Sequence, residues 1–249
     1  MPSIRSNRKR RRQGRFAPVF KLLFLLAMAV ALVLGATVFF QVEHIVVTGN
    51  NRYSQQAIIN ATGIDLGDNL FGVSKSQVSQ NIRRRLPYVQ AVQVLRRLPN
   101  TVAITVTESA AAARLEGEES WLINASGKLL EPAKDETVLT VTGLPPLAPA
   151  AGTPLVTAEE LSFKRESVLS LLQTLEQREL LEQAETLDVT RDGWMELTFA
   201  QRFRVKLPYG ADYSHKLRAL EAAISYREEY ETGVMDLTQR DYDVVFQPD

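Results

Sequence analysis

The residues able to do chemistry are few and are scattered along the chain. There are no cysteines, and only two histidines, His44 and His215, occur among 249 residues. Thiol nucleophiles and cysteine-ligated zinc are therefore excluded, and a multi-histidine metal site is disfavoured. Neither a G-x-S-x-G elbow nor a G-x-x-x-x-G-K phosphate loop occurs, and the only S-x-x-K motif runs from Ser6 to Lys9 in a basic tail. We expect no catalytic residue, no metal and no cofactor.

The other side chains that could act in a site have simpler structural explanations. The glutamates between positions 159 and 185 are spaced as the solvent side of a long amphipathic helix, which explains them better than a glycosidase acid pair does. His44 lies within an apolar strand, where a structural role is favoured over metal binding. Trp121 and Trp194 also lie in predicted strands, which favours core packing over sugar stacking.

Charge is distributed unevenly along the chain although the net charge is zero. Residues 1–42 contain eight basic residues and no acidic one, whereas residues 43–249 contain 21 basic and 29 acidic residues. This asymmetry indicates an oriented protein rather than a neutral one. The basic residues to which we assign membrane orientation are Arg8, Lys9, Arg10, Arg11, Arg12, Arg15 and Lys21. We favour this role over binding to nucleic acid or to lipid headgroups.

An uncharged stretch follows the basic tail. Residues 22–40 form a run of 19 uncharged residues, which as a helix would extend roughly 28 Å, close to the thickness of a bilayer's hydrocarbon core. The positive-inside rule places the N-terminal tail (1–21) in the cytoplasm and the rest outside. A cleaved signal peptide is the competing interpretation, but its apolar region is usually shorter and ends in small residues, whereas this run ends in Val38, Phe39 and Phe40. We predict a single uncleaved transmembrane helix.

The first part after this helix predicts a small domain of order β-α-α-β-β. Strands are expected at 42–47, 89–96 and 101–108, because these segments are rich in β-branched residues and the last of them alternates. Ser54 is expected to cap one helix, with Gly63 at its end, and Ser74 begins a capping-box motif for a second helix that stops at Pro87. Two helices would then cover one face of a three-stranded sheet.

The remainder predicts a second, strand-rich α+β domain. A hairpin is expected over 121–130, an exposed proline-rich loop over 143–154, and one long helix over 159–185. Two strands at 194–199 and 203–207 precede a helix capped by Asp212, and strands at 234–237 and 242–246 close the chain. The fold class is therefore α+β, with these predicted parts: a tail 1–21, a transmembrane helix 22–40, a first domain 41–109 and a second domain 110–249.

Residues 42–108 resemble a POTRA domain of the cell-division family FtsQ/DivIB. The matching pieces are V-x-x-I-x-V-x-G-N from Val42 to Asn50, the Gly67–Phe71 string, and R-x-P-N-T-V-x-I-x-V-x-E from Arg97 to Glu108. The resemblance is moderate over Trp121–Leu130 and weak after position 150. Many members continue after the final glutamate with an arginine and a proline, where this chain has Ser109 followed by four alanines up to Ala113.

The resemblance implies a divisome scaffold that lies outside the cytoplasmic membrane at the division septum. Members associate with two small bitopic proteins, FtsL and FtsB/DivIC, and the complex helps to regulate septal peptidoglycan synthesis. Their partner segment adds a strand near the C-terminal edge of the second domain, which is β-augmentation. In this chain the expected partner-binding residues are Tyr242, Val244 and Phe246, which share one face of the last strand. The alternative is that these three side chains pack onto the domain's own helices.

Two other functions stay open from the sequence. One is an extracytoplasmic cell-wall enzyme or glycan-binding module, and the other is a POTRA-type export chaperone. A chaperone of that kind would usually carry tandem POTRA units or a barrel, and only one POTRA-like unit is visible here. No nucleic-acid partner is expected.

Overall fold

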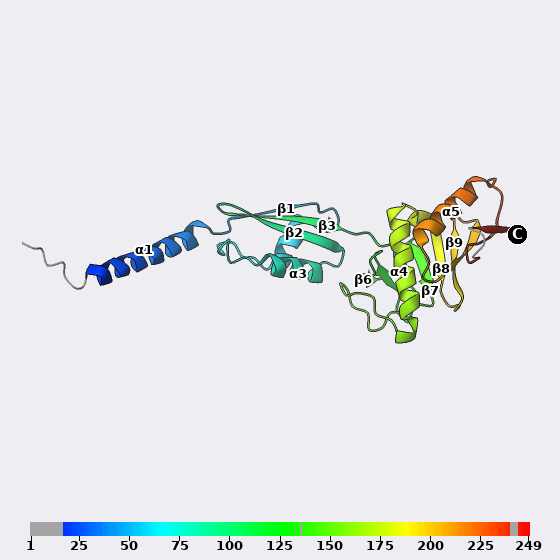
Figure 1. Ribbon diagram of the computed structural model, residues 1–249, viewed down its shortest axis with the longest axis horizontal. Coiled ribbons are helices and arrows are strands. Elements are labelled where there is room, and N and C mark those ends of the chain that lie inside the picture. The colour runs from blue at the N-terminus through cyan, green and yellow to red at the C-terminus, as the bar shows by residue number, and fades with distance from the viewer. Residues whose placement is uncertain (1–16, 135, 240–243) are drawn as a thin grey trace, which may run out of the picture.

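The computed structural model describes residues 17–134, 136–239 and 244–249. Figure 1 shows helix α1 (Ala17–Phe39), a part built on a three-stranded sheet and a part built on a nine-stranded sheet following one another along an elongated molecule. We call the second and third of these parts the first and second domains. The predicted orientation residues Arg8, Lys9, Arg10, Arg11, Arg12 and Arg15 lie outside the described residues, whereas Lys21 lies in the first turns of α1.

Helix α1 covers most of the predicted uncharged span. Its large apolar side chains, among them Phe20, Leu22 and Phe24, are exposed. When the helices in the described part of the chain are compared with the length and hydropathy that a bilayer crossing requires, none of them qualifies.

The first domain has the predicted order β-α-α-β-β. Its sheet has the order β1-β3-β2, with β1 parallel to β3 and β3 antiparallel to β2. The elements are β1 (His44–Thr48), α2 (Gln55–Thr62), α3 (Lys75–Arg85), β2 (Val89–Arg97) and β3 (Thr101–Glu108).

Local signals in the sequence explain where both helices of this domain begin and end. The Ser54 hydroxyl accepts a hydrogen bond from the Ala57 N–H, and Gly63 ends α2 in the left-handed conformation at φ +73°. The Ser74 hydroxyl accepts from the Gln77 N–H. A capping box would also have the Gln77 side chain accept from the Ser74 N–H. Here the Gln77 side-chain amide instead donates to Asn81. The caps place Ile58 and Ile82 in the core, where both are fully buried.

The second domain is built on one nine-stranded sheet of order β12-β11-β10-β9-β8-β7-β4-β5-β6. Its core lies between this sheet and two helices, with Leu171, Leu217 and Phe199 fully or almost fully buried. The strands are β4 (Ala113–Leu115), β5 (Trp121–Ile123), β6 (Leu129–Pro132), β7 (Leu139–Thr142), β8 (Ala184–Asp188), β9 (Trp194–Phe199), β10 (Phe203–Pro208), β11 (Gly233–Asp236) and β12 (Val245–Pro248). The helices are α4 (Ser162–Gln177) and α5 (Tyr213–Ser225), with short 3-10 turns at 159–161 and 181–183.

The predicted long helix over 159–185 is wrong in its extent. Helix α4 ends at Gln177, and Glu179 takes the left-handed conformation at φ +59°, so the chain turns back on itself. Leu180 is buried from this turn rather than from a helix, with its N–H bonded to the Leu175 carbonyl. The segment that follows is strand β8, which pairs with both β7 and β9.

Candidate functional site

The predicted partner-binding strand is an edge of the second domain's sheet. Strand β12 is the last in the strand order and pairs only with β11 among the described residues, so its other side carries no strand (Figure 1). The strand is displaced from the predicted 242–246 to Val245–Pro248, so Val244 directly precedes it and Phe246 lies within it. Tyr242, the third predicted residue, lies outside the described residues.

The register of β12 determines which backbone groups face the open side. Val245 is opposite Asp236, Phe246 opposite Met235 and Gln247 opposite Val234, and the next N–H along, that of Asp249, donates to the Thr232 carbonyl at 3.3 Å. Residues of an antiparallel pair alternate between bonding their partner strand and pointing away from it. The backbone groups of Gln247 and Val245 therefore face β11, and those of Phe246 and Pro248 face outward.

Of the two residues in β12 whose backbone groups face outward, only one has an N–H to donate, because Pro248 has none. That donor is the N–H of Phe246, and the outward carbonyls belong to Phe246 and Pro248. Continuing the alternation, the N–H of Val244 also points outward. Unpaired backbone donors and acceptors in such a row are what an added strand would bind.

The Phe246 side chain packs inward rather than toward a partner. Its ring meets the Phe203 ring edge-on with centroids 6.2 Å apart, and the Arg227 guanidinium lies 4.3 Å from its centroid. Val244 and Phe246 both pack against the core of the second domain and are half-buried. Phe246 thus packs on Phe203 of strand β10 rather than on a helix as the alternative expected, and the open feature of β12 is its backbone.

Strand β11 holds β12 through a glycine that no other residue replaces easily. Gly233 has φ +155°, and a Cβ added there would lie 2.3 Å from the Gln247 carbonyl oxygen and 3.0 Å from the Phe246 ring. Both atoms belong to β12. The absence of a side chain at Gly233 therefore permits the close pairing that creates the edge.

A carboxylate lies at each end of this strand pair. Burial raises the pKa of Asp236, but hydrogen bonds from the hydroxyl and the N–H of Thr238, together with the nearby Lys206, leave that pKa below its ordinary value. Asp236 therefore stays ionised and holds the turn after β11. At the opposite end, Arg204 Nη2 lies 2.6 Å from Asp249 Oδ1, with both groups about half exposed, so this ion pair contributes little energy.

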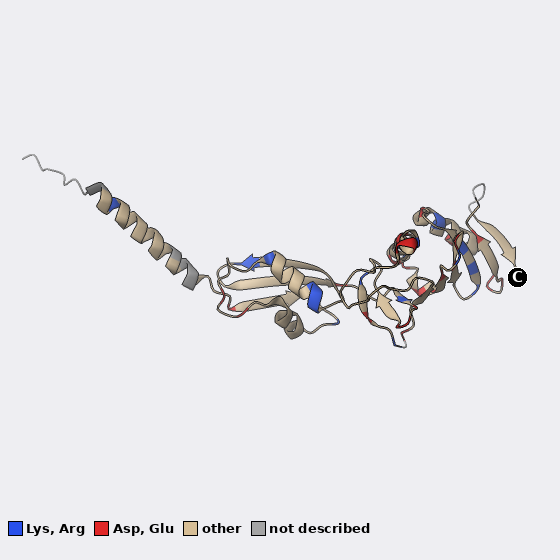
Figure 2. Ribbon diagram, turned by 90° about the horizontal axis from the view of Figure 1, so that it is seen from below, with Lys and Arg blue, Asp and Glu red and all other residues tan. Residues whose placement is uncertain are grey.

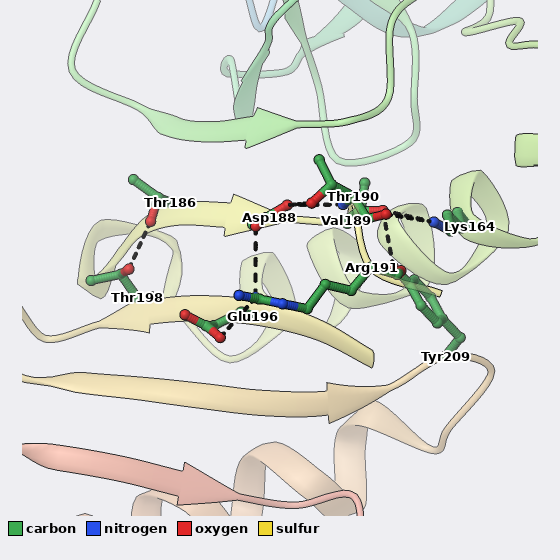
Figure 3. Close-up of polar contacts among 9 residues, drawn as sticks. All are labelled: Lys164, Thr186, Asp188, Val189, Thr190, Arg191, Glu196, Thr198 and Tyr209. Atoms are coloured by element: carbon green, nitrogen blue, oxygen red, sulfur yellow. Dashed lines mark hydrogen bonds and ion pairs between the residues drawn. The ribbon is translucent and has the colours of Figure 1, made fainter. Parts of the chain in front are cut away.

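A polar cluster between β8 and β9 contains ionisable groups but serves the hairpin itself (Figure 3). The Asp188 carboxylate accepts from the hydroxyl and N–H of Thr190, which lowers the pKa of Asp188. The Tyr209 hydroxyl donates to the carbonyls of Val189 and Arg191, and burial raises its pKa to about 12. These polar contacts hold the turn between β8 and β9, and they give the ionisable groups here a structural explanation.

Sequence reasoning missed a second contact region, the junction between the two domains. Glu131, in β6 of the second domain, accepts from Arg52 Nη2 at 2.9 Å and from the Tyr88 hydroxyl at 2.5 Å, both in the first domain. The Arg52 guanidinium stacks on the Tyr88 ring at 3.7 Å. Tyr88 is buried with Leu122 and Leu130. We call these five residues the junction: its charged part is Arg52 and Glu131, and its buried part is Tyr88, Leu122 and Leu130.

Lys128 fastens the other side of the same boundary. Its ammonium group donates to the carbonyls of Arg83 and Val89 at 3.2 and 3.1 Å, at the end of α3 and the start of β2. Burial, and secondarily the charge of Arg83, lower the pKa of Lys128. The Asn124 side-chain amide donates to the Ser109 hydroxyl at 3.1 Å. Ser109 begins the segment where the chain departs from the family pattern, and it is used here as a link between domains.

Residues considered for catalysis or metal binding are dispersed. In the part of the chain that the structure describes, no three His, Asp or Glu side chains are grouped so as to hold a metal ion. His44 is an exposed residue of β1. Trp121 lies in the core as predicted, whereas Trp194 is only half-buried and has the cationic groups of Arg191 and Lys206 at 5.9 and 5.3 Å from its ring.

Comparison with known proteins matches both domains. Residues 40–109 match the model of the FtsQ-type POTRA domain, and residues 111–238 match that of the C-terminal region of the cell-division protein FtsQ/DivIB. The chain is 28% identical to the cell-division protein FtsQ of Geotalea daltonii, over 84% of this chain and 76% of the relative. It is 29% identical to DivIB of Clostridium botulinum over 53% of this chain and 50% of the relative. For DivIB of Bacillus subtilis the identity is 28%, over 49% and 45%.

Proposed function

The chain belongs to the FtsQ/DivIB family of cell-division proteins, and on that premise we propose that it is a non-enzymatic scaffold of the divisome. It binds FtsL-like and FtsB/DivIC-like bitopic proteins at the division septum, and the complex regulates septal peptidoglycan synthesis. Residues 41–109 act as the POTRA domain, and residues 110–249 act as the partner-binding β domain.

The observation that carries this proposal is the open edge of β12. An edge strand whose outward N–H and carbonyl groups are unpaired in the described structure is a template for one more strand. Because the Phe246 side chain is directed to the core, affinity at this edge comes mainly from backbone hydrogen bonds. Selectivity then comes from side chains of neighbouring residues, in the manner of β-augmentation.

The same proposal places the protein in the membrane with a single anchor. The uncharged run 22–40, most of which lies in α1, crosses the bilayer, and the basic tail stays in the cytoplasm. Support comes from the sequence and from the exposed apolar side chains of α1. Both domains then lie outside the cytoplasm, where the septal wall is made.

The test replaces one outward N–H at the edge. Val244→Pro removes a donor that points away from β11 while leaving the β11–β12 hydrogen bonds in place. We expect the full-length variant to lose co-purification with a co-expressed FtsL–FtsB/DivIC pair in detergent while its thermal unfolding changes little.

Val244→Ala is the matched control, because it removes the same apolar side chain and keeps the N–H. It should retain the partners. Equal binding by the proline and alanine variants would exclude strand addition at this edge. Val245→Pro is not equivalent, since the Val245 backbone faces β11, and that variant should weaken the strand pair itself.

A further inference from the structure

The end of the POTRA domain that α1 enters is made by three segments bound to one another. After α1, the Phe40 carbonyl accepts from the Leu70 N–H at 2.8 Å, and the Val42 N–H donates to the Asp68 carbonyl at 2.8 Å. On the other side the Asn100 carbonyl accepts from the N–H of Glu43 at 2.9 Å. The loop after α2 and the β2–β3 turn therefore flank the chain where it leaves α1, as Figure 1 also shows.

Each of these segments exposes a large apolar side chain. Leu66 is 70% exposed and Phe71 is 53% exposed in the loop after α2, Leu98 is 63% exposed in the β2–β3 turn, and Phe39 is 68% exposed at the end of α1. Phe71 is joined to α1 by aromatic contacts, because its ring lies 5.1 Å from that of Phe40, which lies 5.0 Å from Phe39. We call Phe39, Leu66, Phe71 and Leu98 the apolar base of the POTRA domain.

The apolar base adjoins the exposed apolar surface of α1, because Phe39 belongs to that helix and Phe71 reaches it through Phe40. Turns and loops are ordinarily polar, and several large apolar side chains gathered at one end of a small domain indicate a surface that is covered by something non-aqueous. The side chains of α1, such as Leu34 and Leu32, are exposed to a similar degree. One environment would cover both surfaces.

We propose that the apolar base rests in the interface of the lipid bilayer, so that Leu66, Phe71 and Leu98 insert among the headgroups beside the anchor. This rests on the proposed function, because it requires α1 to be the membrane anchor. The POTRA domain is then attached to the membrane in two ways: helix α1 spans the bilayer, and the loops of the apolar base lie in its interface. Because the loops on both sides of the chain at Val42 contact the bilayer, the POTRA domain can tilt only a little relative to the membrane.

Charge contributes little to this contact. Lys75, Arg96 and Arg97 lie near the apolar base, since Arg96 Nη2 donates to the Val73 carbonyl at 2.7 Å next to α3's first turn. Carboxylates of Glu43, Asp65 and Asp68 lie at the same end. Figure 2 shows basic bands toward both ends of the POTRA domain rather than one basic face. Insertion is therefore apolar, and it should depend only weakly on anionic lipid.

The absence of cysteine in the chain permits a direct test by single spin labels. The full-length protein is reconstituted into phosphatidylcholine vesicles, with and without phosphatidylglycerol. Labels are placed by Leu66→Cys, Phe71→Cys or Leu98→Cys, and accessibility to oxygen and to a water-soluble nickel complex is measured. Leu147→Cys is the matched control, because Leu147 is 60% exposed but lies in the second domain. Leu25→Cys, in α1, reports on the anchor.

We expect labels at the three positions of the base to show a several-fold higher ratio of oxygen to nickel accessibility than the label at position 147, in both lipid mixtures. If position 25 is in lipid but positions 66, 71 and 98 match position 147, the lipid contact is wrong and the anchor stands. If position 25 is also in water, the anchor itself is wrong. Protection of the base only after an FtsL–FtsB/DivIC pair is added would identify a protein as its occupant and overturn the lipid contact.

Discussion

Glu108 shows how one carboxylate holds a segment of the POTRA domain. Its two oxygens accept from the N–H groups of Asn51, Arg52 and Tyr53, at 3.0, 2.7 and 3.2 Å. Burial raises the pKa of Glu108, but these three donors and the Arg52 charge together leave it below its ordinary value of 4.5. The segment it holds contains Arg52, so Glu108 also supports the junction between domains.

Replacing Glu108 should lower stability in a way that depends on pH. Glu108→Ala leaves three N–H groups without their acceptor, and we expect a loss of about 1–2 kcal/mol of unfolding free energy at pH 7. Because the folded pKa lies below the unfolded one, the contribution is present above pH 4.5 and disappears as the pH falls through the folded value. Urea unfolding at pH 7 and at pH values below 4.5 measures this.

Glu108→Gln is the matched variant, because it keeps an acceptor oxygen and removes the charge. It should lose less stability than the alanine variant at neutral pH, and the difference from the wild type should narrow in acid. A constant difference across the same pH range would show that the charge of Glu108 is not what stabilises the segment.

At this scale the sequence predicts local contacts and misses distant ones. Ser54, Ser74 and Asp212 were each expected to cap a helix, and each hydroxyl or carboxylate accepts the N–H three residues ahead. A cap depends only on neighbours in the chain. Glu131 meets Arg52 from 79 residues away, and nothing in the local spacing of either residue indicates that pairing.

Among the elements, the pair β11–β12 is the one whose integrity the proposed function needs most. Gly233→Ala should weaken it, since the new Cβ would lie 2.3 Å from the Gln247 carbonyl. We expect a loss of roughly 1–3 kcal/mol in stability and reduced partner co-purification. Differential scanning calorimetry and the pull-down described above measure the two effects.

Gly193→Ala provides the comparison, because a Cβ there meets no atom within 4 Å. That variant should unfold within a few tenths of a kcal/mol of the wild type and bind normally. Equal behaviour of the two alanine variants would contradict the view that close backbone approach at Gly233 forms the edge.

Strand prediction succeeded where alternation or a turn signal was clear, and it failed for β4, β7 and β8, which lack such a signal. Strands β9 and β10 alternate between buried and less buried residues and were expected nearly at their observed bounds. Strands β4 and β7 have three and four residues and were not predicted. They pair parallel to each other, and parallel partners come from distant parts of the chain. Glu179, between α4 and β8, adopts the left-handed conformation that glycine usually takes at a helix end, so the sequence gives no sign that the helix stops there.

For the whole molecule, the junction decides whether the two domains move as one unit. Glu131→Ala removes the acceptor shared by Arg52 and Tyr88, which the structure places in the other domain. We expect a broader distribution of distances between spin labels placed in the two domains by Gln93→Cys and Glu182→Cys, measured by pulsed dipolar spectroscopy. The fold of each domain should be retained.

Glu196→Ala is the control for that experiment, because it removes a carboxylate that pairs with Arg191 inside the second domain. Its distance distribution should match that of the otherwise unsubstituted labelled protein. An unchanged distribution in the Glu131 variant would mean that Leu122, Leu130 and the contacts of Lys128 suffice to hold the domains.

The width of the nine-stranded sheet determines how far the β12 edge lies from the junction with the POTRA domain. Strand β6 meets the POTRA domain at one edge of the sheet, and β12 lies at the other. Eight inter-strand spacings of about 4.8 Å give roughly 38 Å across the sheet. The number of strands therefore sets the distance between the two edges of the sheet. If a partner strand is added at β12, as proposed, it would lie at that distance from the junction, and lengthening a loop would not alter it.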